Sequence, residues 1–159
     1  MKVLVIRHSL AVDPYDAPSD ELRWLTDEGR RRMRAVSEEL LRHLRPTVLF
    51  TSPLTRAVQT AEIFASVAAF DGPVIVHPPL AAEYGTTAQA LSVLERVGDA
   101  ATVVLVSHAP KVRVLAGHLC GEPRMPSFRT AGSCLVEDGE FRWMLDPEPL
   151  RLRTDLDGD

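Results

Sequence analysis

The chain has 159 residues and a formal net charge of -4, with 45% hydrophobic and 25% charged residues. This composition is that of an ordinary soluble globular protein, and it excludes fibrous, collagenous and intrinsically disordered chains. The 22 acidic side chains outnumber the 18 basic ones, which argues against a nucleic-acid-binding protein. The length is that of one domain, so residues 1–159 are expected to form a single unit.

Four short apolar runs predict buried strands. They are rich in β-branched residues and do not alternate with polar ones, as is typical of strands covered on both faces. These runs are Val3–Ile6, Val48–Phe50, Val74–Val76 and Val103–Val106. Strands buried on both faces are usually parallel, so the runs predict a largely parallel sheet.

The segments between these runs show helical spacing of apolar residues, and four helices are expected. One follows Thr26 as its N-cap, and a second begins at Ser52–Pro53, since proline fits a first helical turn. The other two cover Thr87–Val97 and Lys111–Cys120. Helices that alternate with strands predict an α/β fold.

The C-terminal part of the sequence has a different pattern. Asp138–Gly139 is a hairpin signal between two short apolar runs, which predicts antiparallel strands at one edge of the sheet. The last segment, residues 146–159, has little apolar content and is expected to be a loose tail.

The N-terminal apolar run is too short for a signal peptide or a membrane span, so we expect a cytoplasmic protein without a membrane segment. Cys120 and Cys134 are the two cysteines, and they are not spaced as a CxxC motif. Two free thiols in a reducing compartment are the simplest interpretation, although a bridge between them stays open at this point.

Five residues whose side chains can act on a phosphate group follow the predicted strands. Arg7 and His8 come directly after the first strand, and His108 comes directly after the fourth. Arg56 lies one turn into the helix after the second strand, and Glu83 follows the third by a short loop. Open α/β sheets bind ligands at the carboxyl ends of their strands, so these side chains are expected to converge there.

Two arginines and two histidines at one sheet edge are typical of a phosphate site. The guanidinium groups of Arg7 and Arg56 suit phosphoryl oxygens, and a helix beginning near Ser52–Pro53 adds N–H groups that favour an anion. An imidazole attacks phosphorus directly, through a phosphohistidine intermediate. One histidine is therefore expected to be the nucleophile and the other a donor to a phosphoryl oxygen.

These residues resemble the signature blocks of the histidine phosphatase superfamily, which has the phosphoglycerate mutase-like fold. The matching blocks are Arg7-His8, Ser52-Pro53-Leu54-x-Arg56-Ala57-x-Gln59-Thr60 and Ser107-His108. Two further blocks resemble the small bacterial phosphohistidine phosphatases of the SixA type. They are Arg23-x-Leu25-Thr26-x-x-Gly29 and Ser107-His108-x-Pro110.

The resemblance implies a three-layer α/β/α fold, with a mostly parallel central sheet and antiparallel edge strands. It implies that His8 is the nucleophile, that Arg7 and Arg56 bind the phosphoryl oxygens, and that His108 stabilises the transition state. The residues expected to touch substrate are Arg7, Ser9, Arg23, Arg56 and His108.

Two positions need separate comment. The family usually has glycine where this chain has Ser9, whose Cβ restricts the backbone or whose hydroxyl adds a contact to phosphate; both interpretations stay open. Glu83 lies where many superfamily phosphatases carry the acid that protonates an ester leaving group. Its direct participation is also left open, because a phosphorylated imidazole leaves more readily than an alkoxide and needs less acid assistance.

No metal or cofactor is expected. His43, His77 and His118 lack metal-ligand spacing, and the acidic run Asp155–Asp159 ends the chain without following a strand. The sequence has neither a phosphate-cradling GxxxxGK[ST] motif nor a GxGxxG motif, which argues against nucleotide hydrolases and dinucleotide enzymes.

Three functions compete at this stage. The first is hydrolysis of protein phosphohistidine, with a phosphotransfer or signalling protein as partner. The second is hydrolysis of small phosphate monoesters, with Glu83 as general acid. The third is a phosphate-sensing module without turnover.

Overall fold

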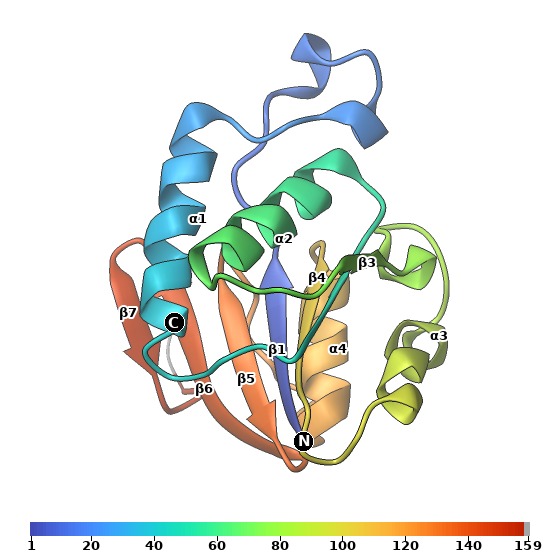
Figure 1. The fold of residues 1–159 in the computed structure, drawn as a ribbon, viewed down its shortest axis with the longest axis vertical. Helices are drawn as coiled ribbons and strands as arrows, with labels where there is room; N and C mark the ends of the chain where they lie inside the picture. The colour runs from blue at the N-terminus through green and yellow to red at the C-terminus, as the bar shows by residue number, and fades with distance from the viewer. Residues whose placement is uncertain (158–159) are drawn as a thin grey trace.

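The computed structural model describes residues 1–157, which form one seven-stranded sheet with helices on both faces (Figure 1). The strand order is β3-β2-β4-β1-β5-β6-β7. The strands are β1 (Lys2–Arg7), β2 (Val48–Thr51), β3 (Val74–Val76), β4 (Thr102–Ser107), β5 (Ser133–Glu137), β6 (Glu140–Pro147) and β7 (Leu150–Arg153). The helices are α1 (Asp27–Leu40), α2 (Thr55–Val67), α3 (Thr87–Leu91) and α4 (Lys111–Cys120), with 3-10 turns at Pro14–Asp16, Asp20–Leu22, Pro78–Leu80 and Ser92–Arg96.

The expected mixed sheet is confirmed. Strands β1 to β4 pair in parallel, and β5 to β7 pair antiparallel at one side. The hairpin between β5 and β6 turns at Asp138 and Gly139, whose φ angles are 50° and 80°. A left-handed backbone is the one that glycine adopts without a Cβ clash, so Gly139 suits this tight turn.

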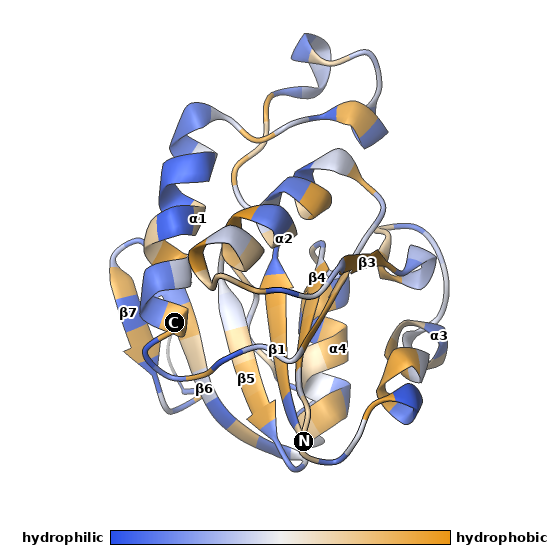
Figure 2. Ribbon diagram, viewed as in Figure 1, coloured by the Kyte–Doolittle hydropathy of each residue, from blue (hydrophilic) through white to orange (hydrophobic). Residues whose placement is uncertain are grey.

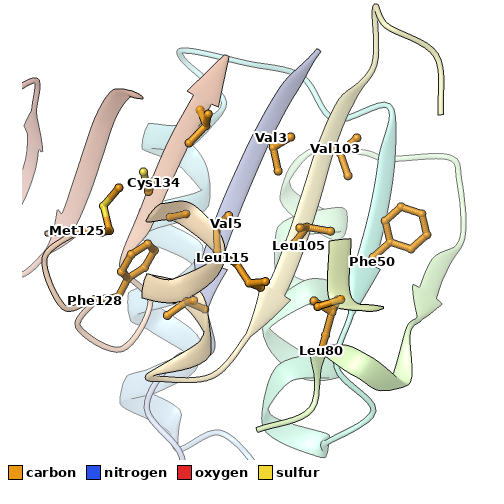
Figure 3. Packing of buried hydrophobic residues seen from close by; sticks show 14 of the residues in the cluster. Val3, Val5, Phe50, Leu80, Val103, Leu105, Leu115, Met125, Phe128 and Cys134 are labelled. Atoms are coloured by element: carbon orange, nitrogen blue, oxygen red, sulfur yellow. The ribbon is translucent and has the colours of Figure 1, made fainter. Parts of the chain in front are cut away.

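Two hydrophobic clusters fill the space between the sheet and its helices. Successive side chains of β1 alternate between them: Val3 and Val5 pack with α4, while Leu4 and Ile6 pack with α1 and α2. The first cluster is drawn in Figure 3, and the central strands β1 and β4 stand out as apolar in Figure 2. Burial on both faces explains the continuous apolar runs of β1 and β4.

The third apolar run is not buried as expected. Strand β3 pairs with β2 alone and is the edge of the sheet, so Ile75 and Val76 are 37% and 49% exposed. A three-residue apolar run looks the same in sequence at an edge as in a sheet centre, because strand order is decided by tertiary contacts.

Two helix boundaries also differ from expectation. Helix α2 begins at Thr55, two residues later, because the Ser52 N–H still donates to the Val106 carbonyl and continues the sheet. The segment expected as one helix over Thr87–Val97 is α3 followed by a 3-10 turn, with Ala90 and Val93 as its buried residues.

The expected loose tail over 146–159 is wrong for its first half. Asp146 and Pro147 complete β6, and Leu150–Arg153 form β7 alongside it. The Arg153 guanidinium donates to the Asp146 carboxylate at 2.7 Å, an ion pair that apolar content does not reveal. The last two residues of the expected tail lie outside the described part of the chain.

Within residues 1–157, none of the helices combines the length and apolar character needed to cross a bilayer. Cys120 and Cys134 are both free thiols, so the bridge left open by the sequence is not formed.

Candidate active site

The carboxyl ends of β1 and β4 bring the two predicted histidines together. Arg7 and Ser107 are register partners in the parallel pair, and the His8 N–H donates to the Ser107 carbonyl at 3.0 Å. The two imidazole rings therefore lie with their centroids 5.1 Å apart. His8 is 8% exposed and His108 is 2% exposed, so the pair is nearly closed off from solvent.

A backbone contact fixes the tautomer of His8. Its Nδ1 lies 2.7 Å from the Ser9 carbonyl oxygen, which can only accept a hydrogen bond. Nδ1 therefore carries the proton in the neutral ring, and Nε2 keeps its lone pair. That lone pair is the form of imidazole that attacks phosphorus.

The surroundings keep both imidazoles neutral. Burial lowers the pKa of His8 to about 4, and the positive charges of Arg56, Arg7 and Arg23 act in the same direction, against the Ser9 hydrogen bond. Burial also lowers the pKa of His108 to about 3, together with the repulsion that a protonated His8 would exert and the charge of Arg56. At neutral pH the site therefore holds an uncharged imidazole among guanidinium groups, which suits it to a dianionic phosphoryl group.

The charge state of His8 gives a first prediction. We expect an NMR titration in phosphate-free buffer, assigned with His8→Ala, to show a His8 midpoint near pH 4 instead of 6.5. Between these two pH values the unfolded chain binds the extra proton, so stability should fall as the pH drops from 6.5 towards 4. A midpoint near 6.5 would show that burial does not control this imidazole.

Arg7 is held by the segment that leads into β5. Its Nη1 donates to the Phe128 carbonyl at 2.7 Å, while the Ala131 N–H reaches the carbonyls of Arg7 and His8 at 3.1 Å each. The Arg7 Nε is buried and has no hydrogen-bond partner within residues 1–157. A donor group of this side chain is therefore available to a bound anion.

Arg56 is anchored by a residue that the sequence analysis missed. Its Nη1 donates to the Asp20 carbonyl at 2.8 Å, and its Nη2 lies 3.2 Å from the Asp20 carboxylate. Arg23 donates to the same carboxylate at 3.1 Å and to the Val12 carbonyl at 2.8 Å. Burial acts against ionisation of Asp20, but the hydrogen bond from Arg23 and the charge of Arg56 lower its pKa. Asp20 thus links both arginines while leaving the Arg56 Nε without a partner in the described chain.

Ser9 is a structural contact and not a free donor. Its hydroxyl donates to the Gly29 carbonyl of α1 at 2.7 Å, and its N–H donates to the Thr60 hydroxyl of α2 at 3.0 Å. A Cβ on Gly29 would lie 2.1 Å from the Leu10 carbonyl oxygen, so glycine is required there. In this structure the one hydroxyl proton of Ser9 is used in the bond to Gly29, and the hydroxyl contact to phosphate stays a prediction.

His108 contacts Ser52, which lies between β2 and α2. Its Nε2 lies 2.7 Å from the Ser52 hydroxyl, which also accepts from the Leu54 N–H at 3.2 Å. The His108 Nδ1 is buried and has no partner within residues 1–157. The sequence analysis quoted Ser52 within a motif but gave it no contact with His108, because only the fold brings them together.

Glu83 lines a cleft of about 600 Å³ together with Arg56, and neither His8 nor His108 is among the residues that line it. The cleft is lined by Asp20, Glu21, Leu54, Arg56, Ala81, Ala82, Glu83 and Tyr84. Lys111 fixes the segment that carries Glu83, since its ammonium donates to the carbonyls of Pro79, Ala81 and Tyr84 at 2.8, 2.5 and 2.5 Å. The Glu83 carboxylate is exposed and faces the same cleft as Arg56.

Within the described residues, no group of three or more His, Cys, Asp or Glu side chains is arranged to hold a metal ion. The potential ligands near the site are instead paired with arginines or with the backbone, as Asp20 and His8 show.

Comparison with known proteins identifies the family of this chain. The sequence pattern of the histidine phosphatase superfamily (branch 1) matches residues 4–88, which include Arg7, His8, Arg56 and Glu83. The chain belongs to the histidine phosphatase superfamily. The expected phosphoglycerate mutase-like fold is confirmed as well. Membership of the superfamily also supports the prediction that the protein is a phosphatase.

Two relatives place the chain within this superfamily. It is 29% identical to the phosphohistidine phosphatase SixA of Escherichia coli, over 96% of this chain and 98% of that protein. The structure of a protein histidine phosphatase SixA complexed with tungstate superposes with a TM-score of 0.84, covering 95% of this chain and all of that one. The similarity to SixA expected from the sequence is therefore confirmed.

A more distant structure shows that the fold is shared by other members. The mycobacterial glucosyl-3-phosphoglycerate phosphatase superposes with a TM-score of 0.65 at 16% identity, covering 98% of this chain and 97% of its own. At this identity the likeness concerns the fold alone, so the fold does not decide the substrate.

Proposed function

We propose that this protein hydrolyses phosphohistidine on a partner protein, with His8 as the nucleophile and without a metal. The observation that carries the proposal is the neutral His8 ring, whose Nδ1 is held by the Ser9 carbonyl while Nε2 keeps its lone pair among guanidinium groups. The similarity to SixA over 96% of the chain supports phosphohistidine as the substrate class.

The proposed reaction has two displacements. In the first, His8 Nε2 forms a bond to phosphorus while the nitrogen–phosphorus bond of the substrate breaks; the departing imidazole keeps the electron pair and takes a proton from water. In the second, a water molecule attacks the phosphorus, and the His8 Nε2–phosphorus bond breaks with its electron pair returning to Nε2. The proton that this water loses neutralises the hydroxide left by the first step, and inorganic phosphate leaves. Arg7, Arg56 and His108 stabilise the transferring oxygens in both steps.

The cleft beside Arg56 is one reason to propose that the substrate is a side chain of another protein. It is about 600 Å³ in volume, and its rim includes Tyr84, which is 61% exposed. A histidine side chain on a folded partner can approach such a rim while its phosphoryl group reaches Arg56. The partner in this proposal is a phosphotransfer or signalling domain.

The test compares two substrates in the presence of a metal chelator. Phosphate release is measured from a phosphohistidine-bearing phosphotransfer protein and from an aryl phosphate ester, with His8→Ala as control. We expect the phosphoprotein to be strongly preferred and the variant to be inactive. Cleavage of the ester alone, or activity that disappears with the chelator, would contradict the proposal.

Small phosphate esters are the second candidate, because Glu83 shares the cleft with Arg56. An alkoxide leaving group needs a positioned acid, worth about 10² to 10⁴-fold in rate. Under our proposal, Glu83→Gln should change phosphohistidine hydrolysis little, since an imidazole leaves more easily. The control is Glu62→Gln, since Glu62 is an exposed residue of α2 that does not line this cleft. A loss of that size in ester hydrolysis relative to this control would identify Glu83 as the acid of an ester phosphatase.

A further inference from the structure

A second cleft, of about 620 Å³, lies between the segment 124–129 and strands β6 and β7. Its lining residues are Arg124, Pro126, Ser127, Phe128, Arg129, Asp146, Glu148, Pro149, Arg151, Arg153 and Leu156. None of the residues Arg7, His8, Arg56 and His108 lines it, so this cleft is separate from the catalytic site. Clefts that bind small molecules enclose about 300 to 1,000 Å³, so this one has a suitable size.

The carboxylates of the cleft are already compensated by arginines. Asp146 accepts from Arg153 at 2.7 Å and lies 3.9 Å from Arg151. Glu148 pairs at 2.5 Å with Arg32, a residue of α1 outside the cleft. These two acidic groups therefore do not neutralise the other arginines of the lining.

Two guanidinium groups remain without a carboxylate partner. Within residues 1–157, no ion pair joins Arg124 or Arg129 to an acidic side chain, and the Arg129 guanidinium donates to the Glu148 carbonyl at 3.0 Å. Both residues are exposed on the segment that forms one wall of the cleft. The lining thus offers two positive charges to a ligand.

Arg153 adds a buried donor on the opposite wall. Its side chain is 9% exposed, and its Nη1 is buried without a hydrogen-bond partner in the described chain. Buried polar groups in native proteins are nearly always hydrogen-bonded, so this guanidinium calls for a further acceptor, and Arg153 is one of the residues that line the cleft. An oxyanion is the natural acceptor, because guanidinium groups match the geometry of phosphate oxygens.

We propose that this cleft binds a small phosphorylated molecule. A phosphate dianion matches the two uncompensated charges of Arg124 and Arg129. The volume exceeds that of phosphate alone, and the apolar surfaces of Pro126, Pro149 and Leu156 are available to an organic group of the ligand. Binding here does not require turnover at His8.

The two sites share one segment of the chain. Phe128 lines the second cleft, and its carbonyl accepts from Arg7 Nη1 at 2.7 Å. Since phosphate is also expected to bind at Arg7 and Arg56, a binding experiment must separate the two sites.

Phenylphosphonate is a suitable probe, because it carries a phosphate-like dianion on an apolar ring and its phosphorus–carbon bond is not hydrolysed. We expect calorimetric titration of the wild type to give two molecules per chain. The Arg124→Ser/Arg129→Ser variant should keep the catalytic site and lose the second, or bind there at least tenfold more weakly. Arg56→Ala should show the reverse, losing the catalytic site and keeping the second.

A charge-matched control excludes a general effect of net charge. Arg42→Ser/Arg96→Ser removes the same charge at two exposed positions away from both clefts. It is expected to bind two molecules, like the wild type. The proposal is overturned if the wild type binds one molecule that Arg56→Ala abolishes, or if the Arg124/Arg129 variant binds like the control. Neither result depends on hydrolysis of phosphohistidine, so failure of the proposed function would be seen separately.

Discussion

Replacing His8 by alanine is expected to abolish both turnover and the covalent phosphoenzyme. The His8 ring supplies the Nε2 lone pair beside Arg7 and Arg56, and within residues 1–157 the other imidazole at this site, His108, has its Nε2 next to the Ser52 hydroxyl. The measurement is rapid quenching with a phosphorus-labelled phosphoprotein, followed by detection of label on the chain. The wild type should carry label at His8, and the variant should carry none.

The control for this experiment is His43→Ala, since His43 lies on the protein surface and pairs with Glu39 at 3.2 Å. It should retain full labelling and turnover. The folding of His8→Ala is checked by its thermal transition, because the substitution removes a buried ring and leaves the Ser9 carbonyl without its donor. Label on a well-folded His8→Ala protein would mean that another group is the nucleophile.

Replacing Arg56 by alanine is expected to lower kcat by about 10² to 10³-fold, the usual loss for one donor to the charge that develops in a transition state. Arg56 is 5% exposed, its Nε has no partner in the described chain, and its charge acts on both histidines. Arg56→Lys keeps the charge but loses the planar fork, so its kcat should lie between those of the wild type and the alanine variant.

The control for Arg56 is Arg42→Ala, which removes an exposed guanidinium paired with Glu39 at 3.7 Å. Its kcat should equal that of the wild type. Asp20 loses one of its two arginine partners in Arg56→Ala, so the position of the segment around it is followed by amide exchange near residues 13–25. Wild-type kcat in a folded Arg56→Ala protein would remove this residue from the proposed mechanism.

The central strands could be predicted because they are buried on both faces. In β1 and β4 each apolar side chain contacts one helical layer or the other, so the sequence shows an uninterrupted run. Strand β7 could not be predicted in this way, since two of its four residues are arginines and its place in the sheet depends on pairing with β6 and on the Arg153–Asp146 contact. The edge position of β3 was hidden for a similar reason.

The proposed catalytic residues could be predicted because they lie at or shortly after the ends of strands that finish at the same edge of the sheet. Arg7-His8 and Ser107-His108 end two parallel neighbours, so their convergence follows from strand direction alone. Asp20 could not be found, because it belongs to a loop between β1 and α1 whose path is set by tertiary contacts. The structural role of Ser9 was also invisible, since its partners Gly29 and Thr60 come from two different helices.

The sequence by itself thus determined the α/β class, the parallel core and the residues that gather at its carboxyl edge, since these depend on local periodicity and strand direction. Only the tertiary structure decided the protonation of those residues. The Ser9 carbonyl sets the tautomer of His8, and burial among guanidinium groups lowers its pKa to about 4. Tertiary structure also brought Arg124 and Arg129 to the cleft beside β6 and β7, because residues distant in the chain become neighbours through packing alone.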